Sequence, residues 1–183
     1  MTPPGRDCPP PVRLISYPHQ RQLPGVKTID YLMAIHLQPT IRERGAFDVL
    51  YHRDGFITEC PRCNFFIVTA EGTLITPARD MLKGITRMKV LGLAADADIP
   101  VEERDLHLDE VRTAHEVFIT STNRHLVPIS HLDDFPIGAA ARPDGPDPAN
   151  PAEAPTAAGP LTLKLNSLLY DLVYHAHPPL PKC

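Results

Sequence analysis

Two pairs of short apolar segments, each pair joined by a glycine-containing turn, most constrain how this chain can fold. The first pair is residues 46–51 and 56–59, separated by Asp54-Gly55, and the second is residues 65–69 and 73–76, around Glu71-Gly72. Glycine favours such tight turns because it adopts positive φ angles without a steric penalty. We therefore expect two β-hairpins in the middle of the chain.

Further helical and extended patterns surround these hairpins. Apolar spacing predicts helices over residues 27–44 (with a break at Pro39), 85–96, 108–114 and 161–174. Short apolar runs predict further strands over residues 12–16, 100–104, 116–120 and 126–129. The helix over 85–96 should bury Met88, Leu91 and Ala95 on one face. Hairpins and helices in alternation predict a mixed α/β (α+β) fold.

The size and charge of the chain exclude several classes of protein. Its 183 residues, 43% of them hydrophobic, suffice for one domain with a sizeable core. The formal net charge of −4 gives no electrostatic reason to expect a nucleic acid or an acidic membrane as partner. No apolar run approaches the roughly 20 residues of a membrane helix, and the N-terminus lacks the apolar core of a secretory signal. We expect a cytoplasmic protein.

Proline marks the segments that should not fold into the domain. The chain has 22 prolines, and they cluster in residues 1–11 and 139–160. Such segments bury too little apolar surface to offset the entropy lost on ordering. We predict a disordered tail over residues 1–11, a folded domain over residues 12–177, and a flexible Pro/Ala-rich insertion over residues 139–160 within it.

One cysteine pair has a spacing used by metal and redox sites. Cys60 and Cys63 are separated by two residues, as in a metal knuckle or a redox pair. A structural zinc site needs four ligands, however, and the sequence has no second pair of this kind. We therefore predict no metal site and two reduced thiols in a loop.

The stretch Met81–Arg87 has the chemistry of an anion-binding helix start. Gly84 opens directly into the predicted helix, and Thr86 follows two residues later. The first backbone N–H groups of a helix are unpaired and the helix dipole makes that end partly positive, so it suits a phosphate. An ordinary junction between a loop and a helix is the alternative.

Three further polar residues lie at strand or turn ends. Lys27 has the apolar neighbours Val26 and Ile29, and desolvation there would favour a neutral, nucleophilic amine that forms Schiff bases. Glu59 ends a strand, where a carboxylate can hold the proton of a cofactor ring nitrogen, and Thr122 lies in a turn with free backbone donors. A surface lysine and a solvated strand end are the alternatives. Together these groups are the components of a pyridoxal phosphate site.

Five stretches, in order, resemble the class IV (fold type IV) pyridoxal-phosphate aminotransferases, a family that contains D-amino-acid and branched-chain aminotransferases and aminodeoxychorismate lyase. The stretches are residues 23–32, 57–66, 74–77, 82–87 and 116–122. The resemblance runs from about Val12 to Gly138 and resumes at Gly159. It implies the C-terminal, cofactor-binding domain of the D-amino-acid aminotransferase-like fold, a barrel-like sheet with flanking helices.

The resemblance also implies roles for particular residues. Lys27 would form the Schiff base with pyridoxal 5'-phosphate and move a proton, and Glu59 would pair with the pyridine nitrogen. The other implied cofactor-binding residues surround the phosphate and the ring: Tyr31, Leu82, Gly84, Ile85, Thr86, Ser121 and Thr122.

The implied function is an aminotransferase that moves an amino group between an amino acid, of the D- or branched-chain type, and a 2-oxo acid. A homodimer is implied as well. Two alternatives remain open: elimination of the aminodeoxychorismate lyase type, or a truncated, weakly active relative. The second arises because family members carry a small N-terminal domain before the lysine, and here only 26 residues precede Lys27.

Overall fold

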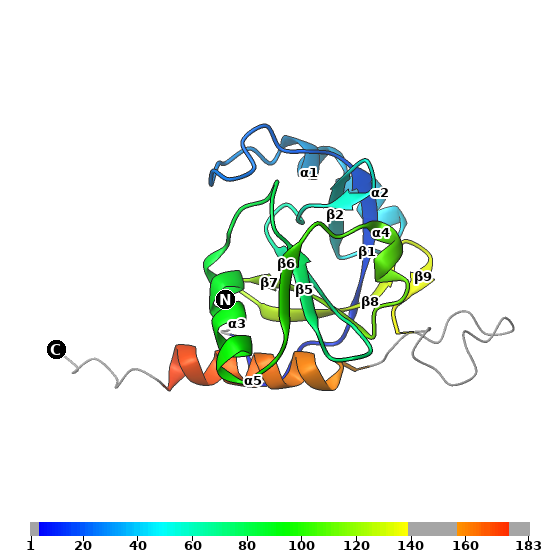
Figure 1. Cartoon of the computed structure of the whole chain (residues 1–183). Helices are drawn as coiled ribbons and strands as arrows, with labels where there is room; N and C mark the ends of the chain where they lie inside the picture. The colour runs from blue at the N-terminus through cyan, green and yellow to red at the C-terminus, as the bar shows by residue number, and fades with distance from the viewer. Residues whose placement is uncertain (1–3, 139–156, 176–183) are drawn as a thin grey trace, which may run out of the picture.

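The computed structural model describes residues 4–138 and 157–175, in which the strands join into one curled sheet (Figure 1). The strands run in the order β3-β2-β1-β8-β7-β4-β5-β6, and β9 pairs with β8. Their bounds are β1 Val12–Pro18, β2 Asp48–Arg53, β3 Phe56–Ile57, β4 Asn64–Val68, β5 Leu74–Pro77, β6 Val101–Arg104, β7 Glu116–Ser121, β8 His125–Leu132 and β9 Phe135–Pro136.

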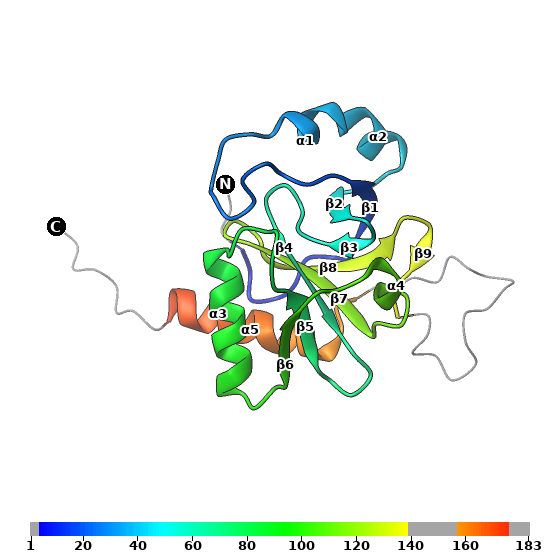
Figure 2. The same ribbon diagram turned by 45° about the horizontal axis from the view of Figure 1, so that its top comes forward.

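Four of the five helices lie in two groups against this sheet. Helices α3 and α5 pack together and against β7, while α1 and α2 pack against β1 and β2 through a separate apolar cluster (Figures 1 and 2). Their bounds are α1 Leu32–His36, α2 Gln38–Glu43, α3 Ile85–Asp96, α4 Leu108–Val111 and α5 Pro160–Tyr174. The mixed α/β fold class is confirmed. None of these helices is long and apolar enough to cross a bilayer, and a cytoplasmic location stays a prediction.

Both predicted hairpins are present. Strands β2 and β3 pair antiparallel around Asp54 and Gly55, whose φ angles are 52° and 85°. Strands β4 and β5 pair antiparallel around Gly72, at a φ angle of 82°. The glycines are therefore used as the sequence predicts, at left-handed positions in the turns.

Alternation along the central strands divides the core between the two faces of the sheet. Phe66 of β4 and Phe118 of β7 stack at a centroid distance of 5.0 Å and face α3 and α5. Their neighbours Phe65 and Ile119 point into a second apolar cluster, on the opposite face. Both faces are covered because successive side chains of a strand point to opposite sides.

The first predicted helix is wrong over its N-terminal part. Residues 27–31 are irregular, and α1 begins only at Leu32. Pro39 lies in the first turn of the separate helix α2, where its missing N–H leaves no helical hydrogen bond unmade. The apolar spacing that suggested one continuous helix therefore belongs to two short helices and a loop.

Helix α3 has the predicted bounds, but its buried face matches the prediction only at Leu91. Val90 and Ala94 are buried and Leu91 packs against the same cluster, whereas Ala95 is exposed and Met88 is 52% exposed. The orientation is set by Arg87, which is buried and donates to the Pro77 carbonyl at 2.9 Å and to Glu103 at 2.7 Å. Apolar periodicity does not detect a polar residue on the buried face, so the predicted face was wrong for Met88 and Ala95.

Part of the predicted tail lies against α5. Arg6 donates to Ser167 at 3.1 Å and pairs with Asp171 at 2.5 Å, and its carbonyl accepts a hydrogen bond from Asn166. The predicted insertion over 139–160 lies mostly outside the described residues, and its last residue, Pro160, is the first residue of α5.

Candidate active site

The chain carries Glu59 to the end of the sheet as a continuation of β3. The amide of Tyr51 in β2 donates to the Glu59 carbonyl at 2.9 Å, so the pairing of β2 extends past the end of β3. Cys60 and Cys63 then pair through their backbones, with the Cys60 amide 2.9 Å from the Cys63 carbonyl. This closed turn fixes the position of Glu59 and returns the chain directly into β4.

Two other loops meet this turn because of the strand register. Asn64, at the start of β4, is paired with Thr120 of β7, which places the turn after β7 (residues 122–124) beside the Glu59 turn. The Asn64 side chain also donates to the Leu82 carbonyl at 2.6 Å. The loop before α3 is thereby held at the same edge of the sheet.

Helix α3 begins at this edge with its free N–H groups. Gly84 is its N-cap residue, and no side chain caps the helix start. Thr86, in the first turn, is largely buried. The unpaired N–H groups of a helix start favour a negatively charged group.

These loops and the irregular segment around Lys27 enclose a cavity of about 200 Å³. All nine residues that the sequence analysis assigns to the cofactor line it: Lys27, Tyr31, Glu59, Leu82, Gly84, Ile85, Thr86, Ser121 and Thr122. Four stretches that are distant in sequence therefore converge on one site.

Glu59 is held by an ion pair that sequence reasoning missed. One of its oxygens accepts from Arg21 Nε at 2.8 Å and lies 2.6 Å from the second guanidinium nitrogen. The other accepts from the Leu82 amide at 3.1 Å. The two side chains are 10% and 6% exposed. Burial raises the pKa of Glu59, while the Leu82 amide and Arg21 act in the opposite direction. The one sequence signal for this ion pair was the presence of an arginine, Arg21, six residues before Lys27.

Lys27 lines the cavity but is not buried among apolar side chains. Lys27 itself is exposed, Val26 is 52% exposed and Ile29 is 94% exposed. The expected desolvation of the lysine by these neighbours is therefore wrong for the described chain. The segment that carries Lys27 is not helical, so its apolar side chains lie in solvent and do not surround the amine.

Thr120 contributes the clearest indication of an absent ligand. Its hydroxyl is buried at the cavity and has no hydrogen-bond partner among the described residues. Such a group is destabilising unless it finds a partner. With the hydroxyl groups of Thr86, Ser121 and Thr122 and the start of α3, it makes a cavity end that suits a phosphate. The residue set thus fits pyridoxal phosphate, and Thr120 was not predicted from the sequence.

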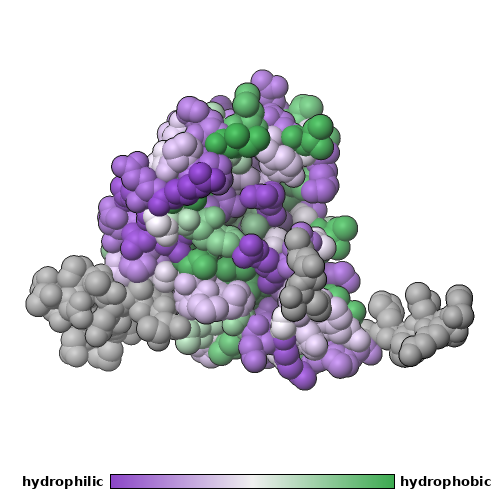
Figure 3. Space-filling model, turned by 180° about the vertical axis from the view of Figure 1, so that it is seen from behind, coloured by the Kyte–Doolittle hydropathy of each residue, from purple (hydrophilic) through white to green (hydrophobic). Residues whose placement is uncertain are grey.

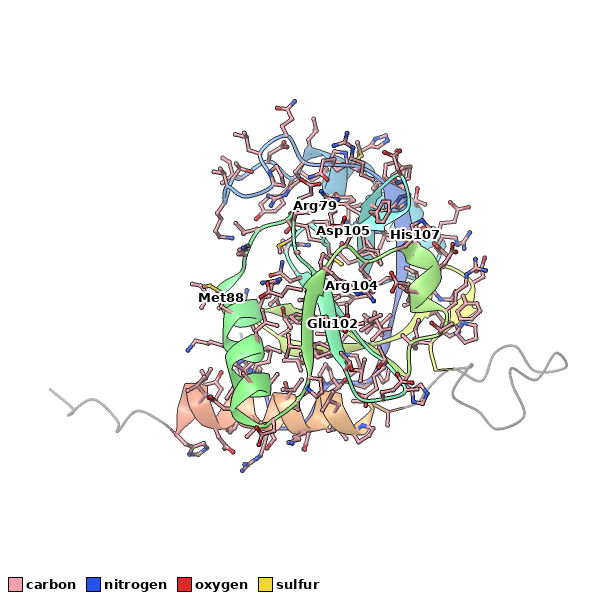
Figure 4. All side chains as sticks on the ribbon, viewed as in Figure 1. Arg79, Met88, Glu102, Arg104, Asp105 and His107 are labelled. Atoms are coloured by element: carbon pink, nitrogen blue, oxygen red, sulfur yellow. The ribbon has the colours of Figure 1, made fainter. Side chains whose placement is uncertain are left out.

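A second concave surface is less suited to catalysis. A cavity of about 250 Å³ lies beside Arg79 and Asp105, which pair with one another. Figure 4 shows these two side chains close together, with Glu102 and Arg104 along β6; the latter two also form an ion pair. Of the charged residues that line this cavity, Arg53 pairs with Asp54 and Arg79 pairs with Asp105, so both arginines already have carboxylate partners.

The cysteine pair lies in the closed turn that follows Glu59. Cys60 and Cys63 are free thiols. Burial raises the pKa of Cys63 to about 12, which keeps the thiol protonated and weakly nucleophilic at neutral pH. Within residues 4–138 and 157–175, no cluster of three or more His, Cys, Asp or Glu side chains is arranged to hold a metal ion.

Gly84 should be intolerant of a side chain. A Cβ atom there would lie 2.4 Å from Asn64 Oδ1, and Asn64 is committed to the Leu82 carbonyl. We expect Gly84→Ala to lower the free energy of unfolding by about 1–3 kcal/mol through overpacking and to weaken cofactor binding. Gly92→Ala is the control, because nothing lies within 4 Å of its added Cβ in the middle of α3. That variant should be stabilised by about 0.5–1 kcal/mol. Equal behaviour of the two variants in urea denaturation would contradict this account of Gly84.

Comparison with known proteins places these features in one family. The family model for amino-transferase class IV matches residues 3–132. A D-alanine aminotransferase of Listeria monocytogenes serotype 4b is 30% identical over 153 residues, which cover 82% of this chain and 47% of that protein. The chain thus spans about half the length of this relative.

Solved structures of similar fold include one named as an aminotransferase and one named as a lyase. A branched-chain amino acid aminotransferase of T.th. origin, complexed with N-(5'-phosphopyridoxyl)-L-glutamate, has a TM-score of 0.73 and 25% identity, covering 92% of this chain and 53% of that one. A Legionella pneumophila protein assigned provisionally as 4-amino-4-deoxychorismate lyase also has a TM-score of 0.73, with 26% identity, covering 88% of this chain and 56% of that one.

Proposed function

Because this chain belongs to the class IV aminotransferase family, we propose that it is the cofactor-binding part of a pyridoxal-phosphate enzyme that moves an amino group between an amino acid and a 2-oxo acid. The observation that carries the proposal is the single cavity lined by Lys27, Glu59 and the start of α3. The named relatives, which transfer amino groups from D-alanine or branched-chain amino acids, support the reaction type.

The two ends of the cavity suit the two ends of the cofactor. The start of α3, with Gly84 and Thr86, and the turn with Thr122 would hold the phosphate. Glu59 would hold the proton of the ring nitrogen, and Arg21 keeps that carboxylate oriented and paired. When bound, pyridoxal phosphate supplies an aldehyde and an electron-withdrawing ring.

Lys27 would perform the covalent and proton-transfer roles. Its Nζ atom would bind the cofactor aldehyde and afterwards move a proton at the Cα atom of the substrate. Tyr31 borders the same space and would line the substrate side.

Incubation of the purified protein with pyridoxal phosphate and pairs of amino and 2-oxo acids tests this function. The proposal expects cofactor uptake and transfer of the amino group that depends on the 2-oxo acid. Release of pyruvate without an acceptor acid would instead favour the lyase alternative, which the Legionella structure supports only through its fold and name. A protein that takes up no pyridoxal phosphate would contradict both.

Thr120→Val tests whether the buried hydroxyl serves the cofactor. Valine has nearly the same shape, so the apoprotein should be as stable as wild type or slightly more stable, because an unpaired buried hydroxyl is removed. The dissociation constant for pyridoxal phosphate should rise by about tenfold, the effect of one hydrogen bond to a charged group. Thr120→Ser keeps the hydroxyl and should bind as wild type does; if both variants bind equally well, Thr120 does not contact the cofactor.

We also propose a homodimer. Apolar side chains are exposed beside the cavity, including Leu23, Val26, Ile29, Leu32 and Ile35. On the face shown in Figure 3, hydrophobic atoms gather at the end of the molecule where α1 lies in Figure 1. Exposed patches of this kind mark interaction surfaces, and a second copy of the chain would cover them and shield Lys27 from water.

A further inference from the structure

A third cavity lies next to the ion pair of Arg21 and Glu59, between α1 and β2, which are neighbours in both Figures 1 and 2. Its volume of about 450 Å³ falls within the roughly 300–1,000 Å³ of typical small-molecule sites. Arg21 and Tyr31 line both this cavity and the proposed cofactor site, so the two spaces adjoin. Lys27 and Glu59 are not among its lining residues, so it is a separate space.

Tyr51 of β2 brings an unpartnered hydroxyl to this cavity. The residue is only 2% exposed, yet it lines the cavity wall. Its hydroxyl has no hydrogen-bond partner among residues 4–138 and 157–175. Burial raises the pKa of Tyr51, so the hydroxyl stays protonated and uncharged at neutral pH. A buried hydroxyl without a partner is destabilising, and a ligand in the cavity can supply the missing hydrogen bond.

His19 places a second polar group beside Tyr51. Its amide donates to the His52 carbonyl at 3.0 Å, which continues the pairing of β1 with β2. Its ring packs edge to face against the Tyr51 ring, with 4.8 Å between the centroids. Burial lowers the pKa of His19, so the ring is uncharged at neutral pH. A neutral imidazole has one nitrogen that accepts a hydrogen bond.

Asp30 supplies a negative charge that the chain leaves uncompensated. Its carboxylate accepts from the Leu32 amide at 3.3 Å, but no nitrogen of Lys, Arg or His in the described parts of the chain lies within 4.0 Å of it. Beside the larger effect of burial, this charge acts to raise the pKa of both His19 and Tyr51, so the carboxylate lies near both groups. The lining cation Arg21 is already paired with Glu59 at 2.6 Å.

The rest of the lining is apolar or aromatic. Met33 and Ala34 of α1, Pro61 and the ring of Tyr31 border the same space. Aromatic rings attract cations at their faces, and apolar walls favour an apolar ligand body. The cavity therefore combines one free carboxylate, two neutral polar groups and an apolar wall.

We propose that this cavity binds an organic monoamine with an apolar body, apart from the cofactor site. A protonated primary amine has three N–H donors, and the cavity offers three acceptors: the Asp30 carboxylate, the Tyr51 hydroxyl oxygen and a His19 ring nitrogen. The apolar body would lie against Met33 and Ala34. A carboxylate ligand would instead meet the like charge of Asp30, and a neutral ligand would leave that charge unpaired.

Three small ligands of similar shape test the inference. 2-Phenylethylamine carries the ammonium group, 2-phenylethanol is neutral, and 3-phenylpropanoate carries the opposite charge. Calorimetric titration of the full chain, without added cofactor, should give binding of the amine about tenfold tighter than that of the alcohol. High salt should weaken binding of the amine.

Two substitutions remove the proposed contacts without removing bulk. Asp30→Asn should raise the dissociation constant for 2-phenylethylamine by about tenfold, because a charged hydrogen-bond partner is lost. Tyr51→Phe removes only the hydroxyl and should raise it by about fivefold. The folded state should tolerate Tyr51→Phe, because the hydroxyl has no partner within the described residues.

Asp98→Asn and Tyr17→Phe are the matched controls. Asp98 is exposed, as Asp30 is, and Tyr17 of β1 is paired in register with Tyr51. Neither residue lines this cavity. Both variants should bind 2-phenylethylamine as wild type does. The inference is overturned if the alcohol or the carboxylate binds as tightly as the amine, or if Asp30→Asn and Tyr51→Phe bind the amine like their controls.

A second titration separates this cavity from the cofactor site. The protein is first loaded with pyridoxal phosphate and reduced with borohydride, which leaves no aldehyde to react with the amine. Binding of 2-phenylethylamine should persist with an unchanged stoichiometry. Loss of binding after loading would place the amine in the cofactor cavity and refute the separate site alone. Amine binding that depends on Asp30 in a protein that takes up no pyridoxal phosphate would refute the proposed function alone.

Discussion

Lys27→Ala should abolish the covalent attachment of pyridoxal phosphate to this protein. Alanine has no amine, so nothing at this position can bind the cofactor aldehyde or move a proton at the substrate carbon. Amino transfer should fall by on the order of 10³-fold or more, because one residue supplies both functions. Reduction with borohydride followed by peptide mass spectrometry should find the reduced cofactor on the Lys27 peptide of the wild type and on no peptide of the variant.

Lys83→Ala is the control for that experiment. Lys83 lines the same cavity and lies next to the start of α3. Its loss should leave the modification of Lys27 intact and weaken cofactor binding at most modestly, through the lost positive charge. If the modification followed Lys83 and Lys27→Ala retained it, the assignment of the reactive lysine would be wrong.

Arg21→Gln should produce the largest loss of stability among substitutions at the site. Arg21 and Glu59 form an ion pair at 2.6 Å with side chains 10% and 6% exposed. Removing one partner of a buried pair leaves the other charge uncompensated, at a cost of about 3–5 kcal/mol. Urea denaturation at pH 8 should therefore show a decrease of about that size in the free energy of unfolding.

The loss should depend on pH in one direction. Burial already raises the pKa of Glu59, and without Arg21 the pKa should rise further. A carboxyl group whose pKa is higher in the folded than in the unfolded state lowers the stability of the fold most at pH values above its folded pKa. The penalty decreases as pH falls below that value and is lost below the unfolded pKa, because both states then hold the proton. The deficit of Arg21→Gln relative to wild type should therefore be smaller at pH 5 than at pH 8.

A double substitution separates the charge effect from lost packing. In Arg21→Gln/Glu59→Gln neither charge remains, so the stability should recover part of the loss and the pH dependence of the deficit should vanish. If Arg21→Gln is as stable as wild type at pH 8, or if its deficit grows toward acid pH, Glu59 is not the group that Arg21 compensates.

Local features of this fold were readable from sequence. Gly55 and Gly72 mark turns whose positive φ angles exclude most residues, and the neighbouring strands pair as expected. Helix α3 begins directly after Gly84, as predicted. These features depend on a few consecutive residues, so their physical cause lies within the stretch that was read.

Features that depend on distant partners were not readable. Arg21 meets Glu59 across 38 positions of sequence, and Thr120 becomes an unpaired buried hydroxyl only when β7 lies beside β4. The buried face of α3 is set by Arg87 and its partner Glu103 in β6. A single sequence contains each of these residues but does not show which residues they contact in the folded protein.

The amino-acid sequence alone predicts three features: the helix start in residues 81–87, the two hairpins, and the resemblance of five stretches to one family. It does so because turn chemistry, periodicity and motif order are local properties. Tertiary structure alone decided that Lys27 is exposed, that Arg21 pairs with Glu59, and that Asp30 and Tyr51 border one cavity. The reason is that burial and charge pairing arise between segments, from the way a curled sheet brings its loops to one edge.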